Sequence, residues 1–145
     1  MPSSTCTIVT VERQLTAVVR ESVPFAKIPD AQRSARARLA AVLPTLDAGP
    51  LGRTCTRWTP PAGGMLPMEM GTIVARAFQA VGDVVPSDLP AGRAVHFSMK
   101  GSFDGLPGAW ETVFAWCTAE KLVPAGINWE IYGATADAEL YALLA

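Results

Sequence analysis

Metal ligands and paired cysteines are scarce in this sequence. Cys6, Cys55 and Cys117 are odd in number and widely spaced, no Cys-x-x-Cys occurs, and the chain has a single histidine. This pattern argues against a disulfide framework and against a zinc site, and no glycine-rich phosphate-binding loop is present. We therefore expect reduced, mostly buried thiols and no metal or other cofactor.

Strong net charge and long apolar runs are also missing. The formal charge is −1, and the basic residues are scattered except for Arg33, Arg36 and Arg38, so no basic stripe is available to nucleic acid. No run approaches the roughly 20 apolar residues that cross a bilayer, and residues 1–5 lack the basic and apolar regions of a signal peptide. We expect a cytoplasmic protein without direct nucleic-acid or membrane binding, as a monomer or weak homodimer.

The sequence does contain alternating strand and helix patterns that fit one domain, residues 1–145, with a single core. In the first half we expect strands at 7–11, 15–20, 53–59 and 66–75, and a helix at 30–46 with Asp30 as its N-cap. Residues 78–90 predict a linker, which is followed by a tight Pro-Ala-Gly turn.

The second half repeats this order. We expect a strand at 93–100, a helix at 106–120 capped by Asp104 or Ser102, and strands at 127–133 and 140–144. Residues 17–19 align with 94–96 at an offset of 77, and residues 52–58 align with 126–132 at an offset of 74. The predicted class is α+β: duplicated β-α-β-β units with pseudo-twofold symmetry, a curved antiparallel sheet with both helices on one face, and a pocket at the seam. The predicted first repeat spans about 5–75, the linker 76–90 and the second repeat 91–145.

An aromatic strand near the end of the chain carries one carboxylate. Side chains alternate along a strand, so Asn128, Glu130 and Tyr132 share one face, and Trp129 and Ile131 share the other. A buried carboxylate without a partner is costly, which makes Glu130 the leading site candidate. If its face borders a cavity, desolvation raises its pKa, and the ionised form attracts a cation across a low dielectric.

Other side chains are candidates for the walls of this site. Aromatic rings add cation–π attraction of about 0.5–2 kcal/mol each, and methionines such as Met65 and Met70 can repack around different ligands. The ligand-binding residues that we expect are Glu130, Tyr132, Trp110, Trp58, Phe97, Met68, Phe103 and Glu69.

Each candidate also has a purely structural interpretation. Glu130 could pair with Arg57 or Arg93, and Glu69 could be a solvated charge at a strand edge. The tryptophans of the second helix could fill the core, and one methionine of each alternating set should do so. His96 lies in an apolar run and is expected to be structural rather than a base or a ligand.

Short motifs follow one another through the second half: Leu89-Pro-Ala-Gly92, His96, Gly101-Ser-Phe-Asp-Gly-Leu106, Trp116, Pro124-Ala-Gly126 and Trp129-Glu-Ile-Tyr132. Each is poorly specific alone, but their order and spacing resemble the GyrI-like (gyrase-inhibitor-like) domain, the effector-binding module also found behind AraC-type and MerR-type regulators. Weaker matches at Val11-Glu-Arg13 and Met68-Glu-Met-Gly71 extend the resemblance to the whole chain.

The resemblance implies a pseudo-twofold β-α-β-β pair whose seam pocket takes drug-like, often cationic and aromatic compounds. It also implies that a glutamate at the position of Glu130 lies at the base of the pocket. Phe103 stands where the family often has the tyrosine of a Gly-Pro-Tyr, so it offers no hydroxyl to a ligand. Residues 133–137 lack the commoner Asp-Pro turn, which predicts a looser last hairpin.

Two function classes remain open. The first is a stand-alone small-molecule-binding protein, a sensor or sequestering module, because the domain occupies the chain and no helix-turn-helix is expected. The second is a hydrolase of cyclopropane-bearing or other electrophilic natural products, with Glu130 as general base on a water. Inhibition of DNA gyrase, which some similar domains perform, has no signature in these residues.

Overall fold

The structure, a computed structural model, describes residues 5–135 and 137–145. The prediction that the chain starts without a signal peptide rests on residues 1–5. Of these, residues 1–4 lie outside the described residues. Ala136, in the last predicted turn, lies outside them too. Among the described helices, none has the length and apolar character needed to span a bilayer.

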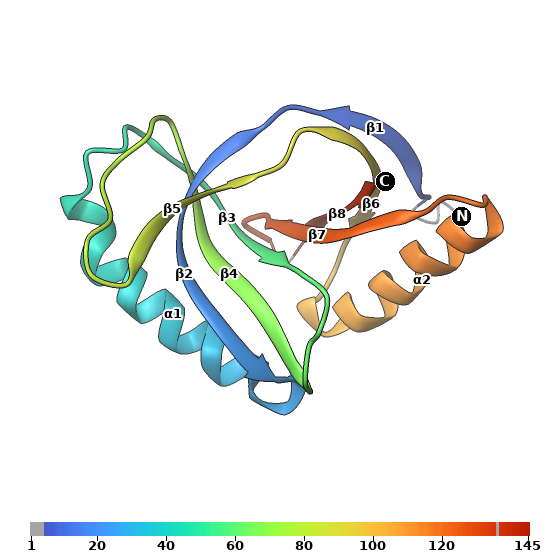
Figure 1. Ribbon diagram of the computed structural model, residues 1–145, viewed down its shortest axis with the longest axis horizontal. Coiled ribbons are helices and arrows are strands. Elements are labelled where there is room, and N and C mark those ends of the chain that lie inside the picture. Colours follow the sequence, from blue (N-terminus) through green and yellow to red (C-terminus); the bar gives the residue numbers. More distant parts are fainter. Residues whose placement is uncertain (1–4, 136) are drawn as a thin grey trace.

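Within these ranges the chain forms one antiparallel sheet of eight strands and two α-helices (Figure 1). The strand order is β1-β6-β8-β7-β3-β4-β2-β5. In chain order the elements are β1 (Thr7–Val11), β2 (Gln14–Pro24), α1 (Ile28–Val42), β3 (Leu51–Trp58), β4 (Met65–Val74), β5 (Val84–Leu89), β6 (Gly92–Met99), α2 (Leu106–Ala119), β7 (Pro124–Tyr132) and β8 (Ala138–Leu144). The predicted α+β class with a curved antiparallel sheet is confirmed.

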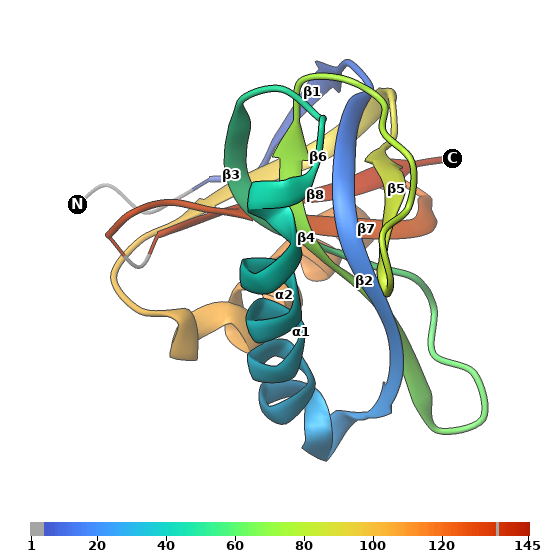
Figure 2. The same ribbon diagram turned by 90° about the vertical axis from the view of Figure 1, so that its left-hand side faces the viewer.

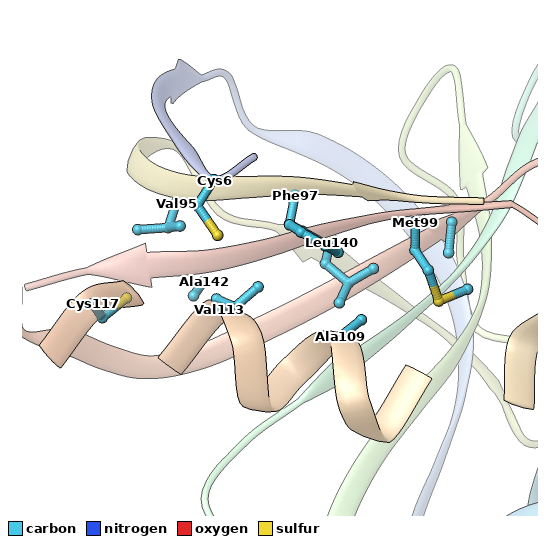
Figure 3. Packing of buried hydrophobic residues seen from close by; sticks show 10 residues of the cluster. Cys6, Val95, Phe97, Met99, Ala109, Val113, Cys117, Leu140 and Ala142 are labelled. Atoms are coloured by element: carbon cyan, nitrogen blue, oxygen red, sulfur yellow. The ribbon is translucent and has the colours of Figure 1, made fainter. Parts of the chain in front are cut away.

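Both helices pack on the same face of the sheet (Figures 1 and 2). α1 buries Ala35 and Leu39, one turn apart, against β2 and β4. α2 buries Ala109, Val113 and Cys117, each four residues from the next, against β6 and β8 (Figure 3). A third cluster on the other face is formed by strand residues alone.

Strand register carries one row of side chains across the helix-bearing face. Successive cross-strand partners in this row are Val19, Met70, Thr56, Glu130, Leu140 and Phe97. The first two pack in the α1 cluster, and the last two pack in the α2 cluster. Thr56 and Glu130 therefore lie between the two clusters that the helices form with the sheet.

A strand, β5, lies where the sequence predicts only a linker. Residues 84–89 pair with β2 at the edge of the sheet, with Pro86 opposite Ala17. An edge strand needs ladder hydrogen bonds on one side only, so it tolerates a proline that a central strand would exclude. The proline and the polar Ser87 and Asp88 made this strand resemble a turn-rich linker.

The helix ends differ in detail from those predicted. Asp30 is not the N-cap of α1, because the helix begins at Ile28 with a proline in its first turn, and Asp30 pairs with Arg33 instead. α1 also ends four residues early, since a proline follows. The predicted caps of α2 are wrong, because its N-cap is Gly105, which makes no side-chain cap hydrogen bond. The hydroxyl of Ser102 instead accepts a hydrogen bond from the Asp104 N–H at 3.2 Å and caps the 3₁₀ turn that precedes α2.

The three cysteines are free and buried, as predicted. Burial raises the pKa of the Cys55 thiol to about 12, with a smaller contribution from the charge of Glu69. Such a thiol is protonated at neutral pH and is a weak nucleophile.

Candidate functional site

A cavity of about 480 Å³ opens between the N-terminal ends of α1 and α2 on the helix-bearing face. This volume falls within the range of roughly 300–1,000 Å³ that is typical of small-molecule sites. We call it the helix cavity. Its lining residues are Phe25, Ile28, Pro29, Gln32, Trp58, Leu66, Phe103, Leu106, Pro107, Trp110, Phe114, Asn128 and Glu130.

Glu130 is the single charged residue among these lining residues, and it is only 3% exposed. The Trp110 indole N–H donates to its Oε2 at 2.6 Å, and the Tyr132 hydroxyl lies 2.6 Å from its Oε1. The Tyr132 hydroxyl also lies 2.7 Å from the Thr56 hydroxyl. When Glu130 is ionised, the one phenolic proton goes to the carboxylate and Thr56 donates to Tyr132.

Burial raises the pKa of Glu130 above its ordinary value of 4.5, because the charged form loses its hydration. Donors from Trp110, Tyr132 and Trp58 act in the opposite direction but do not cancel this effect. The pKa of Tyr132 is raised well above its ordinary value, first by burial and then by the neighbouring charge of Glu130. The phenol is therefore neutral, and Glu130 is the group at this site whose protonation can change.

Two further polar atoms at the wall have no partner. The Trp58 Nε1 and the Asn128 Oδ1 are buried, and neither makes a hydrogen bond within the part of the chain that the structure describes. The Trp58 dipole still favours the charged form of Glu130, although its N–H is outside hydrogen-bonding geometry. One donor and one acceptor beside the cavity therefore have no hydrogen bond within these residues, which is uncommon for buried polar groups.

The alternative interpretation, in which Glu130 forms an ion pair with Arg57 or Arg93, is wrong. Arg57 is the cross-strand partner of Trp129, so it belongs to the opposite face of the sheet. There its Nη1 contacts Asp88, at 2.7 Å from the carboxylate and 2.8 Å from the carbonyl oxygen. Across residues 5–135 and 137–145, no ion pair involves Glu130 or Arg93.

Aromatic rings surround the carboxylate and reach the surface. Trp110 stacks on Phe114 with ring centroids 5.6 Å apart, and Phe103 meets Tyr132 edge-on at 5.4 Å. Phe25, Phe103 and Phe114 are 57%, 43% and 37% exposed. Exposed phenylalanines gathered at one opening are typical of a binding surface rather than of a core.

The structure brings about half of the predicted ligand-binding residues to the helix cavity. Glu130, Trp110, Trp58 and Phe103 line it, and Tyr132 supports Glu130 through the hydrogen bond described above.

Three predicted residues lie elsewhere. Phe97 is buried in the cluster under α2, and Met68 is buried in the cluster beside α1. Glu69 lies on the opposite face of the sheet, where it pairs with Arg20 at 3.1 Å and accepts a hydrogen bond from Ser87.

His96 has the structural surroundings that the sequence predicts. Its Nε2 lies 2.6 Å from Glu139, and its ring lies 4.9 Å from the ring of Tyr141.

Several residues that line the cavity were not predicted from the sequence, although a repeated local pattern marks them. Phe25-Ala-Lys-Ile-Pro29 and Phe103-Asp-Gly-Leu-Pro107 share the pattern Phe-x-x-aliphatic-Pro. Each segment forms a 3₁₀ turn that leads directly into its α-helix. The phenylalanine, the aliphatic residue and the proline of both segments line the helix cavity. The two helix entries thus form corresponding walls of the helix cavity.

Sequence comparison identifies one family. The model of the family described as the GyrI-like small molecule binding domain matches residues 4–142. No curated protein is significantly similar to the chain in sequence.

Solved structures share the fold at low identity. The EcmrR C-terminal domain superposes with a TM-score of 0.76 and 16% identity, covering 98% of each chain. The structure described as the EcmrR-DNA complex in EcmrR-RPo has a TM-score of 0.81 and 15% identity, and it covers 97% of this chain and 57% of that one. This chain therefore spans little more than half of that EcmrR chain. SAV2435 bound to tetraphenylphosphonium superposes with a TM-score of 0.73 and 13% identity, covering 97% of this chain and 94% of that one.

Proposed function

Because this chain belongs to the GyrI-like small molecule binding domain family, we propose that it binds aromatic, lipophilic cations in the helix cavity, with Glu130 as the counter-charge. The observation that carries this proposal is the carboxylate itself. It is 3% exposed and held by two neutral donors, and no cationic side chain in the described residues pairs with it.

A ligand cation is the partner that this carboxylate lacks. At about 6 Å and an effective dielectric constant of about 20, a charge pair gains roughly 3 kcal/mol. Rings such as Trp58, Trp110 and Phe114 add cation–π attraction of about 0.5–2 kcal/mol for each well-placed ring. The apolar wall and the buried acid together favour ligands that are both aromatic and positively charged.

The hydrogen bonds around Glu130 suit both of its protonation states. In the neutral form the acid proton can go to the Tyr132 oxygen, and Tyr132 then donates to Thr56. In the charged form both bonds reverse, and Trp110 donates in either case. An empty cavity therefore holds the neutral acid at little cost, while a bound cation favours the carboxylate.

The proposed biological role is sensing or sequestration of such compounds. Both α-helices are committed to packing on the sheet, so the described residues contain no helix-turn-helix. The SAV2435 structure, which has the same fold, contains tetraphenylphosphonium. That compound carries one delocalised positive charge within four phenyl rings and is the natural probe for this chain.

A charge-reversed pair of ligands tests the proposal. Tetraphenylphosphonium and tetraphenylborate have nearly the same shape and opposite charges, and quenching of tryptophan fluorescence reports occupancy next to Trp58 and Trp110. We expect the cation to bind at least about 100-fold more tightly than the anion, because the anion meets Glu130 without a compensating charge. Equal affinities would mean that shape and apolar contact alone select the ligand.

Product analysis separates binding from hydrolysis by Glu130. If the protein binds without hydrolysing, a spirocyclopropyl dienone incubated with it should decay no faster than in the protein-free control. Turnover that disappears in Glu130→Gln would assign the chain to the hydrolase alternative.

Cation binding is expected to weaken as the pH falls. The pKa of Glu130 is raised in the empty protein, so acidification protonates it and a cation must displace that proton to regain the charge pair. Titration of tetraphenylphosphonium between about pH 5 and pH 8 should show affinity that rises with pH in the wild type. Glu130→Gln should show a flat profile, and a flat wild-type profile would contradict the linkage.

The same carboxyl should lower the stability of the empty protein. Its folded-state pKa is above 4.5, so its stabilising contribution is complete below that value and is lost as the pH rises through the folded pKa. Glu130→Gln removes this titration, so its stability advantage over wild type should grow from acidic to neutral pH. Urea denaturation at several pH values measures the difference in unfolding free energy between the two proteins. A wild type whose stability rises relative to the variant as the pH rises would contradict the prediction.

A further inference from the structure

A second cavity, of about 550 Å³, lies beside β2, β4 and β5. Thr16 and Arg20 line it, and they alternate along β2 with Ala17 and Val19, which pack in the α1 cluster. Arg57 lines it from β3 and is the cross-strand partner of Trp129. Trp129 packs in the cluster of strand residues on the face without helices, so Arg57 belongs to that face too. This second cavity is therefore built mainly on the face opposite to the helix cavity.

Positive charge exceeds negative charge around this space. Its charged lining residues are Arg13, Arg20, Arg57, Arg76, Glu69 and Asp88. Four guanidinium groups thus face two carboxylates, and a third carboxylate, Asp47, pairs with Arg76 from outside the lining. One positive charge remains uncompensated even when Asp47 is counted.

The ion pairs leave guanidinium donors unused. Asp88 is shared, since it accepts from the Nε of Arg13 at 2.5 Å and from Arg57 at 2.7 Å. Arg20 also uses only its Nε, which lies 3.1 Å from Glu69. The terminal amino groups of Arg13 and Arg20 make no hydrogen bond to any described residue, so they can serve as a fork for an oxyanion.

Two buried polar atoms of this wall have no hydrogen-bond partner. Thr16 is 1% exposed, and its hydroxyl bonds to nothing among residues 5–135 and 137–145. The Nε of Arg57 is buried and equally unpartnered. Buried polar groups in folded proteins are normally satisfied, and two orphaned donors in one cavity indicate an acceptor that comes from outside the chain.

We propose that this second cavity is a binding site for a small oxyanion, a phosphate or carboxylate group held between Arg13, Arg20 and Arg57 with the Thr16 hydroxyl as a further donor. Phe78 and Leu15 line the same cavity and offer an apolar surface to the remainder of an organic anion. The site is independent of Glu130 and of the proposed cation cavity. The protein would then bind two ligands of opposite charge in two separate cavities.

Calorimetric titration at constant ionic strength tests this site, with inorganic phosphate and citrate as probes and sodium chloride as the background salt. We expect at least one probe to bind, and the comparison of the two distinguishes a phosphate from a carboxylate ligand. Arg20→Gln should weaken that binding at least about fivefold, because it removes a charged donor.

Thr16→Val is the sharper variant, because valine keeps the shape of threonine and lacks only the hydroxyl. That hydroxyl has no partner in the empty protein, so the variant should be at least as stable as wild type and yet bind the anion several-fold more weakly. Arg36→Gln, on the exposed face of α1, makes the same charge change as Arg20→Gln outside the cavity and should leave binding unchanged. Failure of both probes to bind would overturn the proposal, as would equal losses in Arg20→Gln and Arg36→Gln.

Discussion

Glu130→Gln is expected to weaken tetraphenylphosphonium binding by about 30- to 150-fold, which corresponds to roughly 2–3 kcal/mol. Glutamine keeps the size of the side chain, and its amide can still accept from Trp110 and bond to Tyr132. The variant therefore changes the charge at the base of the helix cavity and little else. Fluorescence or calorimetric titration of wild type and variant gives the ratio directly.

A matched control separates the local charge from the net charge of the molecule. Glu111 is exposed on α2, next to Trp110 in sequence, and Glu111→Gln makes the same change of net charge. We expect its affinity for the cation to stay within about twofold of wild type, because exposed charges are screened by water and salt. Equal affinity in wild type and Glu130→Gln, or equal losses in both variants, would remove Glu130 from the site.

Gly71→Ala is expected to cost about 3 kcal/mol or more of folding stability, a loss of roughly 10 °C in Tm. A Cβ at this position would clash with the backbone carbonyl of Ala17 and the Cα of Val18 on the neighbouring strand. These are backbone atoms of β2, paired with β4 in the sheet, so no side chain can rotate away to make room. Thermal and urea denaturation of the purified variant measure the loss.

Gly108→Ala is the matched control, because the same glycine-to-alanine change should there raise folding stability. Gly108 is exposed in α2, and an added Cβ would meet nothing within 4 Å. Alanine has the higher helix propensity, so this variant should gain about 0.5–1 kcal/mol. If Gly71→Ala were as stable as wild type, the close contact of Gly71 with the backbone of β2 would be contradicted.

The position of Glu130 was predictable because strand alternation is a local rule. The sequence correctly placed Glu130 with Asn128 and Tyr132 on one face and Trp129 on the other, and β7 has this arrangement. Alternation does not say which part of a face a helix will cover. Phe97 lies in the same cross-strand row as Glu130 but beneath α2, so it packs in the core instead of lining the cavity.

Residues outside the strands were harder to predict. Phe25 and Phe114 line the helix cavity because of how each helix is oriented on the sheet, and a single sequence contains no direct record of that orientation. The repeated Phe-x-x-aliphatic-Pro segments were the one local signal for Phe25. The edge strand β5 was missed for a related reason, since its pairing with β2 depends on a partner distant in sequence.

The location of a bound cation in a crystal shows whether the helix cavity is the binding site. Tetraphenylarsonium has the shape and charge of tetraphenylphosphonium, and arsenic gives an anomalous signal in a crystal of the complex. We expect one peak in the helix cavity, among Trp58, Phe103 and Trp110, with the carboxylate of Glu130 about 6 Å from the arsenic, a distance at which charges still stabilise one another. A peak elsewhere on the protein, with the helix cavity empty, would contradict the account.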